Sequence, residues 1–233
     1  MKIELNGKIP VLSYKEIDAR ASLLLNQLDP TIIANGDITP LELIVEKFLQ
    51  FDLDYQYLSN NQYYLGRTVF TKGTEVIVTN KKFNEIDIIS VNHPTIYIEQ
   101  SLLDTDDLRY PFTLAHELGH AVLHKPLFYE NEDQLTLFDV SKFGKNSSYK
   151  PLTRLDLIEA GHRDIDNKNV TELDWIEWQA NVFAACILIP KKSLLTFYQK
   201  YEKNYRFFIN DVANKFSTSY SVAEIRIKNL QLL

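Results

Sequence analysis

The sequence predicts an α+β protein in which a small, mainly antiparallel sheet lies beside helices. Segments with the 3.6-residue apolar period of helices occur together with segments that alternate like strands. A hairpin-like pattern lies among the helices, without the strand–helix alternation that marks a parallel sheet. Hydrophobic residues make up 45% of the 233 residues, enough for one large domain or one domain plus a small one.

Two helices are expected near the N-terminus. Residues 13–28 place apolar side chains on one helical face, and residues 39–50 form a second apolar stripe. In the second segment Thr39 can serve as the N-cap and Pro40 fits the first helical position. Glu42 completes a capping box, so the sequence predicts a helix that begins at Thr39.

Strands are expected next along the chain. The stretch RTVFTKGTEVIVT, residues 67–79, alternates around Lys72–Gly73 and predicts a hairpin. The stretch TIYIE, Thr95–Glu99, predicts another strand. A helix is then expected from about Pro111 to His124, since Pro126 cannot continue it.

A long connection separates this helix from the next strong one. Residues 127–170 are mixed in composition and hold an acidic patch and turn-rich stretches, which favours a functional flap or a partly ordered segment. A helix is predicted over residues 171–190, with Thr171 and Asp174 as its capping box and Pro190 as its end. Three short helices are expected afterwards, so residues 1–190 and 191–233 are the predicted domains.

The composition argues against several classes of protein. A net charge of −6 does not favour a protein that mainly grips phosphate backbones. The single cysteine, Cys186, lies in an apolar run, which predicts a buried thiol and no intrachain disulfide. The N-terminus lacks the apolar core of a signal peptide, and residues 182–189 are far shorter than a membrane span of ~20 residues. We therefore expect a soluble, cytoplasmic protein with no membrane contact.

The stretch FTLAHELGHAVLH, residues 112–124, carries a chemical signature. His116 and His120 lie one helical turn apart, so both imidazoles can reach a single ion. Glu117 can stand beside that ion and take a proton from a water molecule, as in the H-E-x-x-H signature of metallopeptidases. The alternative is an amphipathic helix that carries these residues by chance.

The residues around the signature favour the metal site. Apolar side chains surround the helix on almost all sides, which predicts burial, and buried histidine and glutamate side chains need partners. Gly119 costs about 1 kcal/mol relative to alanine inside a helix. Such a glycine predicts the close approach of another strand or helix.

A catalytic zinc site usually has three protein ligands and an open position for water. His124 lies about 12 Å along the helix from His116, so we expect it to be a cation or hydrogen-bonding group near the helix end. Glu177, among aromatic residues of the second strong helix, is the predicted third ligand of Zn²⁺. Asn181, one turn later, is expected to bond one of the histidines. The alternative for Glu177 is a surface glutamate.

FTLAHELGHAVLH followed by EWQANVFAACILIP resembles the ImmA/IrrE family of zinc metallopeptidases, a gluzincin-like group with the HExxH motif. The resemblance implies a zincin-like metallopeptidase core. His116 and His120 match the family's histidine ligands, Glu117 its catalytic glutamate, and Glu177 its third ligand. The segment between the two blocks is longer than we expect for the family.

The resemblance also implies a function, a zinc metalloendopeptidase that cleaves helix-turn-helix repressors of bacteria or mobile elements and so releases transcription. Glu117 would pass the proton of the attacking water to the leaving amine. Zinc and one further donor would stabilise the oxyanion. His162 and Arg154 are candidates for that donor, although the favoured reading of each is an ordinary loop residue.

A second reading comes from the C-terminal stretch VANKFSTSYSVAEIRIKNL, which resembles a helix-turn-helix with Ser221 and Glu224 as a capping box. Lys215, Arg226 and Lys228 could meet phosphate groups. The stretch can also be a helical cap that packs on the domain before it. The alternative function is therefore a non-proteolytic regulator that acts by binding protein or DNA. The sequence does not predict the oligomeric state.

Overall fold

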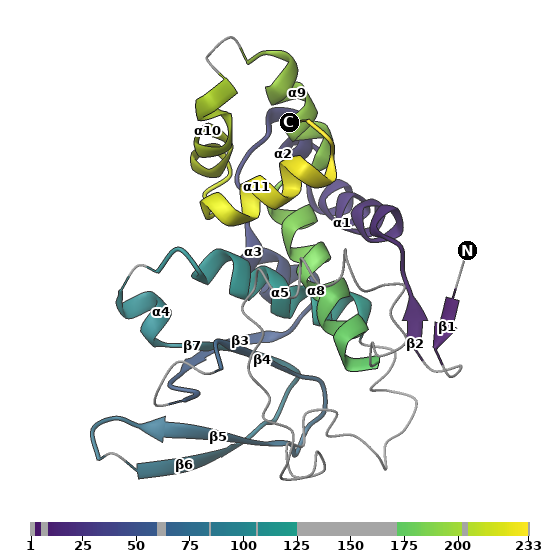
Figure 1. Cartoon of the computed structure of the whole chain (residues 1–233). Coiled ribbons are helices and arrows are strands. Elements are labelled where there is room, and N and C mark those ends of the chain that lie inside the picture. The colour runs from purple at the N-terminus through teal and green to yellow at the C-terminus, as the bar shows by residue number, and fades with distance from the viewer. Residues whose placement is uncertain are drawn as a thin grey trace.

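The protein is described by a computed structural model, shown in Figure 1. It describes residues 3–5, 9–59, 64–83, 85–105, 107–124, 172–201 and 205–232. The α-helices are α1 (Tyr14–Leu28), α2 (Pro30–Asn35), α3 (Leu41–Leu43), α4 (Ser101–Asp104), α5 (Tyr110–Leu123), α8 (Glu172–Leu188), α9 (Lys191–Gln199), α10 (Phe208–Lys215) and α11 (Tyr220–Asn229). The strands are β1 (Ile3–Leu5), β2 (Ile9–Val11), β3 (Asp52–Gln56), β4 (Gly66–Val69), β5 (Glu75–Asn80), β6 (Glu85–Ser90) and β7 (Thr95–Glu99).

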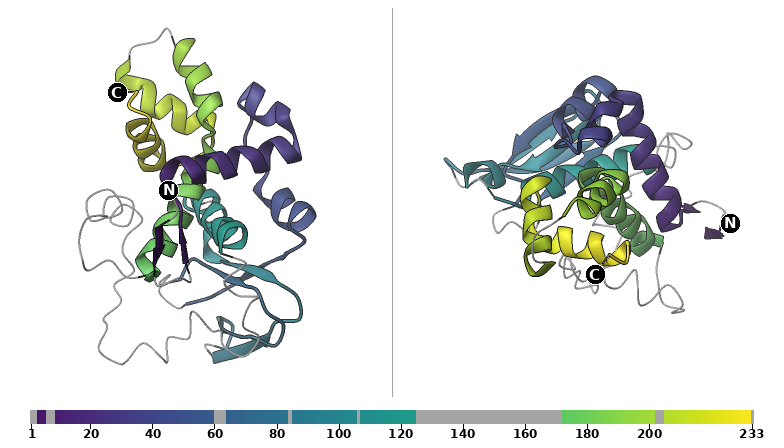
Figure 2. Two further views of the ribbon diagram at one scale, coloured as in Figure 1. Left: turned by 90° about the vertical axis from the view of Figure 1, so that its right-hand side faces the viewer. Right: turned by 90° about the horizontal axis from the view of Figure 1, so that it is seen from above.

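The α+β class is confirmed, with the helices and strands gathered at opposite ends of the molecule. Helices α9, α10 and α11 lie at one end, the β5–β6 hairpin lies at the other, and α5 and α8 stand between them (Figure 1). The left view of Figure 2 shows the same order. The helix and strand predicted over residues 111–124 and 95–99 are present as α5 and β7.

The first helix, α1, begins directly after its N-cap. Ser13 caps α1 in a full capping box with Glu16, and Ile17 and Leu25 on its inner face are fully buried. Such a cap contributes about 1 kcal/mol to helix stability. The helix predicted over residues 13–28 is thus confirmed.

The capping box predicted at Thr39 is wrong. Helix α3 begins at Leu41 without a side-chain cap and continues as a π-helix, η1 (Ile44–Phe48). The Thr39 hydroxyl donates instead to the backbone oxygen of Ile187 at 2.7 Å. Glu42 accepts a hydrogen bond from the Tyr110 hydroxyl at 2.8 Å. Both side chains thus make hydrogen bonds to distant parts of the chain. The bond from Thr39 supplies a donor to the Ile187 carbonyl in the last turn of α8.

Strand β7 is the centre of a small mixed sheet with the order β3-β7-β4. It pairs antiparallel with β4 but parallel with β3, so this sheet is not mainly antiparallel as predicted. Ile96 and Ile98 of β7 face the main core, whereas Tyr97 faces a smaller second core. The first of these faces lies toward α5.

The hairpin predicted around Lys72–Gly73 is also wrong. Strand β4 pairs with β7, and β5 pairs with β6 instead. Gly73, at φ 85°, donates its N–H to the Val91 oxygen and so leads the chain into the second ladder. Because Val76 and Val78 of β5 join the second core, β5 and β6 cover the sheet rather than extend it.

The helices after Pro190 share the main core with the rest of the chain. Arg226 of α11 is fully buried and bonds the Tyr14 hydroxyl and the Asp18 carboxylate of α1. Its Nε also donates to the Ile189 oxygen at 2.9 Å. The last helix thereby joins the first helix to the end of α8.

Helix α11 begins slightly earlier than the sequence predicts. Ser219 is the N-cap and accepts a hydrogen bond from the Val222 N–H, so a capping box of Ser221 and Glu224 is wrong. Glu224 pairs instead with Lys228 at 2.8 Å, one turn later on the same helix. The helix therefore carries its own exposed ion pair.

Cys186 of α8 is buried as predicted, and burial raises the pKa of its thiol to about 12. No described helix alone has the length and the hydropathy of a membrane span. Helices α8 and α9 meet that test only as a pair, and they are bent from one another by 47°.

Candidate metal centre

Helices α5 and α8 pack side by side at a glycine (Figure 1). A Cβ atom added to Gly119 would lie 3.1 Å from both the Cα and the carbonyl oxygen of Ala180. Real Cβ atoms rarely come so close to backbone. The prediction that Gly119 permits a close neighbour is confirmed, and that neighbour is the helix that carries Glu177.

The side chains of His116, His120 and Glu177 converge on one point. The two Nε2 atoms of the histidines lie 3.0 Å apart. Glu177 places Oε2 3.2 Å from the His116 Nε2 and Oε1 3.5 Å from the His120 Nε2. The three side chains are 17%, 5% and 15% exposed in that order, so the point of convergence is largely shielded from solvent.

The donor set fits a divalent metal ion. Ligand atoms about 2.0–2.2 Å from one zinc ion at tetrahedral angles lie roughly 3.3–3.6 Å from one another, and the three separations here are 3.0, 3.2 and 3.5 Å. Two imidazoles and one carboxylate are ligands that zinc commonly takes. Burial lowers the pKa of His116, but the hydrogen bond and charge of Glu177 outweigh it and raise that pKa. The Glu177 carboxylate that favours a proton on His116 would equally favour a metal cation at the position of that proton.

Asn181 orients the first histidine. Its Oδ1 lies 3.0 Å from the Nδ1 of His116. Because a carboxamide oxygen can only accept, Nδ1 of this imidazole carries a proton, and Nε2 is the nitrogen that is left to bind a metal ion. This is the tautomer that a metal ligand needs.

His124 orients the second histidine. The Nδ1 atoms of His120 and His124 lie 3.0 Å apart, and the side chain of His124 is buried. Burial lowers the pKa of His124 to about 3, although a hydrogen bond with Gln179 raises it. His124 is therefore neutral, and its Nδ1 can accept the Nδ1 proton of His120. Of the two roles expected for this residue, the cation is wrong.

The Glu117 side chain lies against strand β4. It is 7% exposed, and the Thr68 hydroxyl donates to its Oε2 at 2.7 Å. Burial raises the pKa of Glu117 to about 7, whereas the charge of His116 and the bond from Thr68 lower it. A carboxyl group with a pKa near neutrality can both take and release a proton at physiological pH.

The sequence prediction gives His124 a role only at the helix end and gives Thr68 none. The role of His124 had a signal, because it follows His120 at the same spacing as His120 follows His116. Thr68 had none, since only the pairing of β4 with β7 places it beside Glu117. His162, Arg154, Thr171 and the connection over residues 127–170 lie outside the described residues.

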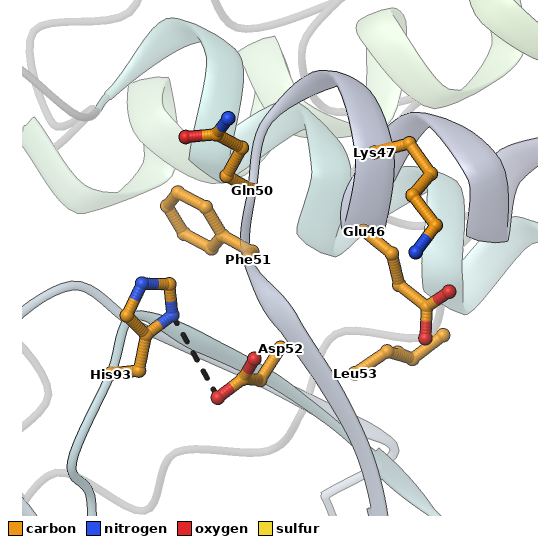
Figure 3. Close-up of a pocket in the computed structure, with 7 residues that line it drawn as sticks. All are labelled: Glu46, Lys47, Gln50, Phe51, Asp52, Leu53 and His93. Atoms are coloured by element: carbon orange, nitrogen blue, oxygen red, sulfur yellow. Dashed lines mark ion pairs between the residues drawn. The ribbon is translucent and has the colours of Figure 1, made fainter.

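A separate hollow of about 450 Å³ lies between η1, β3 and the loop before β7. Figure 3 shows its residues, among them His93, whose Nδ1 stands 3.7 Å from the Asp52 carboxylate. Both of these side chains are more than half exposed. The hollow holds none of the converging residues and is not part of the candidate metal centre.

Comparison with known protein families supports the assignment of this chain as a peptidase. The model of the IrrE N-terminal-like domain, a peptidase family, matches residues 156–228, which include Glu177 and Asn181 but not the His116–His120 motif. Searches of curated proteins and of solved structures find no match. The resemblance to the ImmA/IrrE family is therefore confirmed over residues 156–228, the part of the chain that matches the model of this peptidase family.

Proposed function

We propose that the protein is a zinc-dependent metalloendopeptidase with a zincin-like core. His116, His120 and Glu177 hold the metal, and Glu117 is the general base. The convergence of the three ligand atoms beside a buried glutamate carries this proposal. The match to a peptidase family supports it independently, since that match covers Glu177 but does not depend on the histidine motif.

Zinc bound to these ligands would supply a Lewis acid that acidifies a water molecule and polarises the peptide carbonyl. The remaining steps belong to the side chains of the chain itself. Glu117 takes the proton of the attacking water and delivers it to the nitrogen of the leaving amine. Its raised pKa suits both halves of this transfer.

The supporting side chains keep the ligand set preorganised. Asn181 and His124 fix the proton of each ligand histidine on Nδ1, so both Nε2 lone pairs face the metal position. Gly119 keeps α8 close enough for Glu177 to complete the set. These contacts come from both helices, which explains why the site needs the packed pair.

For the substrate we propose a helix-turn-helix transcriptional repressor, cut at one site in the cytoplasm. The resemblance of both sequence blocks to the ImmA/IrrE family supports this choice. We also propose that residues 1–190 form the metallopeptidase region and residues 191–233 a helical region that completes it. Partners other than the substrate are not required by this proposal.

The alternative function, DNA binding through the C-terminal helices, is disfavoured because the cationic side chains proposed to bind phosphate are buried or already paired. Arg226 is fully buried and Lys228 pairs with Glu224. The Lys215 ammonium lies over the rings of Phe197 and Phe216, at 5.7 and 5.5 Å from their centroids. Contact with phosphate would have to break these interactions, so the alternative reduces to regulation by protein binding.

The deciding experiment compares the protein with its Glu117→Gln variant and, as a control, Glu46→Gln. Each is loaded with zinc, assayed for bound metal, and incubated with the repressor encoded beside its gene. We expect one zinc in all three and cleavage lost only in Glu117→Gln. Absence of metal from the unmodified protein, or equal cleavage by Glu117→Gln, would overturn the proposal. Derepression by an inactive Glu117→Gln variant would favour the binding function.

A further inference from the structure

The carboxylate of Glu117 rests on two residues of strand β4. The Thr68 hydroxyl lies 2.7 Å from its Oε2. A Cβ atom added to Gly66 would lie 2.5 Å from Oε1, 2.7 Å from Cγ and 2.9 Å from Cδ of the same side chain. One residue therefore holds this carboxylate by a bond, and the other accommodates it by having no side chain.

The register of the sheet explains why these two residues meet the helix. Gly66 pairs with Ile98 and Thr68 with Ile96, and both isoleucines are fully buried in the main core. Because side chains alternate along a strand, residues 66 and 68 face the same side. Val69 faces the opposite side, where it joins the second core. A shift of β4 by one residue would remove both contacts to Glu117.

The Thr68 hydroxyl has a second acceptor in reach. It also lies 3.1 Å from the backbone oxygen of Glu117. A hydroxyl group carries one proton and two lone pairs, and it rotates to suit its partners. The Thr68 hydroxyl is thus within hydrogen-bond distance of both the side chain and the backbone of Glu117.

We propose that Thr68 is a positioning residue for the Glu117 carboxylate, and that Gly66 leaves the space this position requires. The inference rests on the proposed function, in which Glu117 is the general base. A glutamate side chain has several rotatable bonds. Without Thr68 the carboxylate keeps its chemistry but is no longer held in one orientation, so the reaction slows while substrate binding is maintained.

The test compares Thr68→Val with Thr68→Ser. Valine keeps the volume of threonine but cannot donate a hydrogen bond, whereas serine keeps the hydroxyl. Thr95→Val is the matched control, because Thr95 is equally buried in the neighbouring strand and its hydroxyl donates to the His93 oxygen at 2.6 Å. Thr95 has no bond to Glu117, so its variant reports the loss of a buried bond alone.

Three measurements are made on the zinc-loaded proteins: metal content, kcat and KM on a peptide spanning the repressor cleavage site, and the orientation of Glu117 in crystals. We expect Thr68→Val to lower kcat by about 10-fold or more, a part of the ~10²–10⁴-fold effect of a general base. KM and zinc content stay unchanged. Thr68→Ser should restore kcat to within a few-fold, and Thr95→Val should leave it unaltered.

Gly66→Ala supplies an independent probe. Its new methyl group meets only the flexible Glu117 side chain among the nearest atoms, so we expect a displaced carboxylate and a lower kcat with zinc retained. If the unmodified protein cleaves the peptide while Thr68→Val is equally active with Glu117 unmoved, the positioning role is wrong. If the unmodified, zinc-loaded protein does not cleave, the proposed function fails instead.

Discussion

Gly119 of α5 and Ala180 of α8 meet backbone to backbone, and an added Cβ at Gly119 would stand 3.1 Å from two backbone atoms of Ala180. This contact sets the distance between the helices that carry the proposed ligands. Backbone cannot move aside as a side-chain end can. The spacing of the candidate metal centre thus depends on a residue that is not one of the proposed ligands.

We expect Gly119→Ala to destabilise the protein. Replacing glycine by alanine inside a helix normally stabilises it by about 1 kcal/mol, but overpacking at a tight contact costs about 1–3 kcal/mol. The helices should also separate, which moves Glu177 away from the histidines and weakens zinc binding. Urea unfolding and zinc titration measure the two effects. A variant that is more stable and binds zinc as before would show that the contact does not control the spacing.

Zinc should stabilise the fold through its three ligands. A ligand that binds only the folded state at about 100 times its Kd adds about 2.7 kcal/mol to the free energy of unfolding. We expect the melting temperature to rise with added zinc and to fall with a chelator. Glu177→Ala should lose most of this response, whereas Glu75→Ala, an exposed control, should retain it. An equal response of both variants would exclude Glu177 from the ligand set.

His124→Phe should weaken zinc binding without unfolding the protein. The change removes the acceptor for the Nδ1 proton of His120, and loss of such an outer partner typically lowers metal affinity about 10–100-fold. Competition with a chromogenic chelator measures this affinity. His93→Phe is the control, because His93 lies at the surface. Unchanged affinity in His124→Phe would mean that His120 is oriented by packing alone.

Arg226→Ala should be severely destabilising. Removing one partner of a buried ion pair costs about 3–5 kcal/mol, and Arg226 bonds Tyr14, Asp18 and the Ile189 oxygen at once. Lys228→Ala, on the same helix, removes only an exposed pair and should change stability by about 0.5 kcal/mol or less. Urea unfolding of both variants tests the difference. Similar midpoints would show that the buried network contributes little.

Much of the helical framework could be predicted from the sequence because its signals are local. Ser13 and Glu16 form their capping box within one turn, and the helix from about residue 111 follows from apolar periodicity. The capping box at Thr39 failed because a distant carbonyl, that of Ile187, competes for the same hydroxyl. Local patterns do not reveal such competition.

Strand pairing was harder to predict for the same reason. The alternation in residues 67–79 is real, but its two halves belong to different sheets. Which strand pairs with which depends on the two cores, and these are assembled from residues far apart in the chain. The convergence of His116 and Glu177 could be anticipated from residue types, whereas the contact of Thr68 with Glu117 required the register.

The bonds of Arg226 also constrain how the protein is made. Arg226 bonds Tyr14 and Asp18, which lie more than 200 residues earlier in the chain. Helix α1 therefore leaves the ribosome long before Arg226 is synthesised. Contacts between such distant segments form late, after most of the chain entropy has been lost. Until α11 is synthesised, Tyr14 and Asp18 lack their buried partner, and a chain held in such an incomplete state is prone to aggregation. A ribosome stalled before α11 should therefore hold a chain whose first helix is not yet fixed to the end of α8 through Arg226.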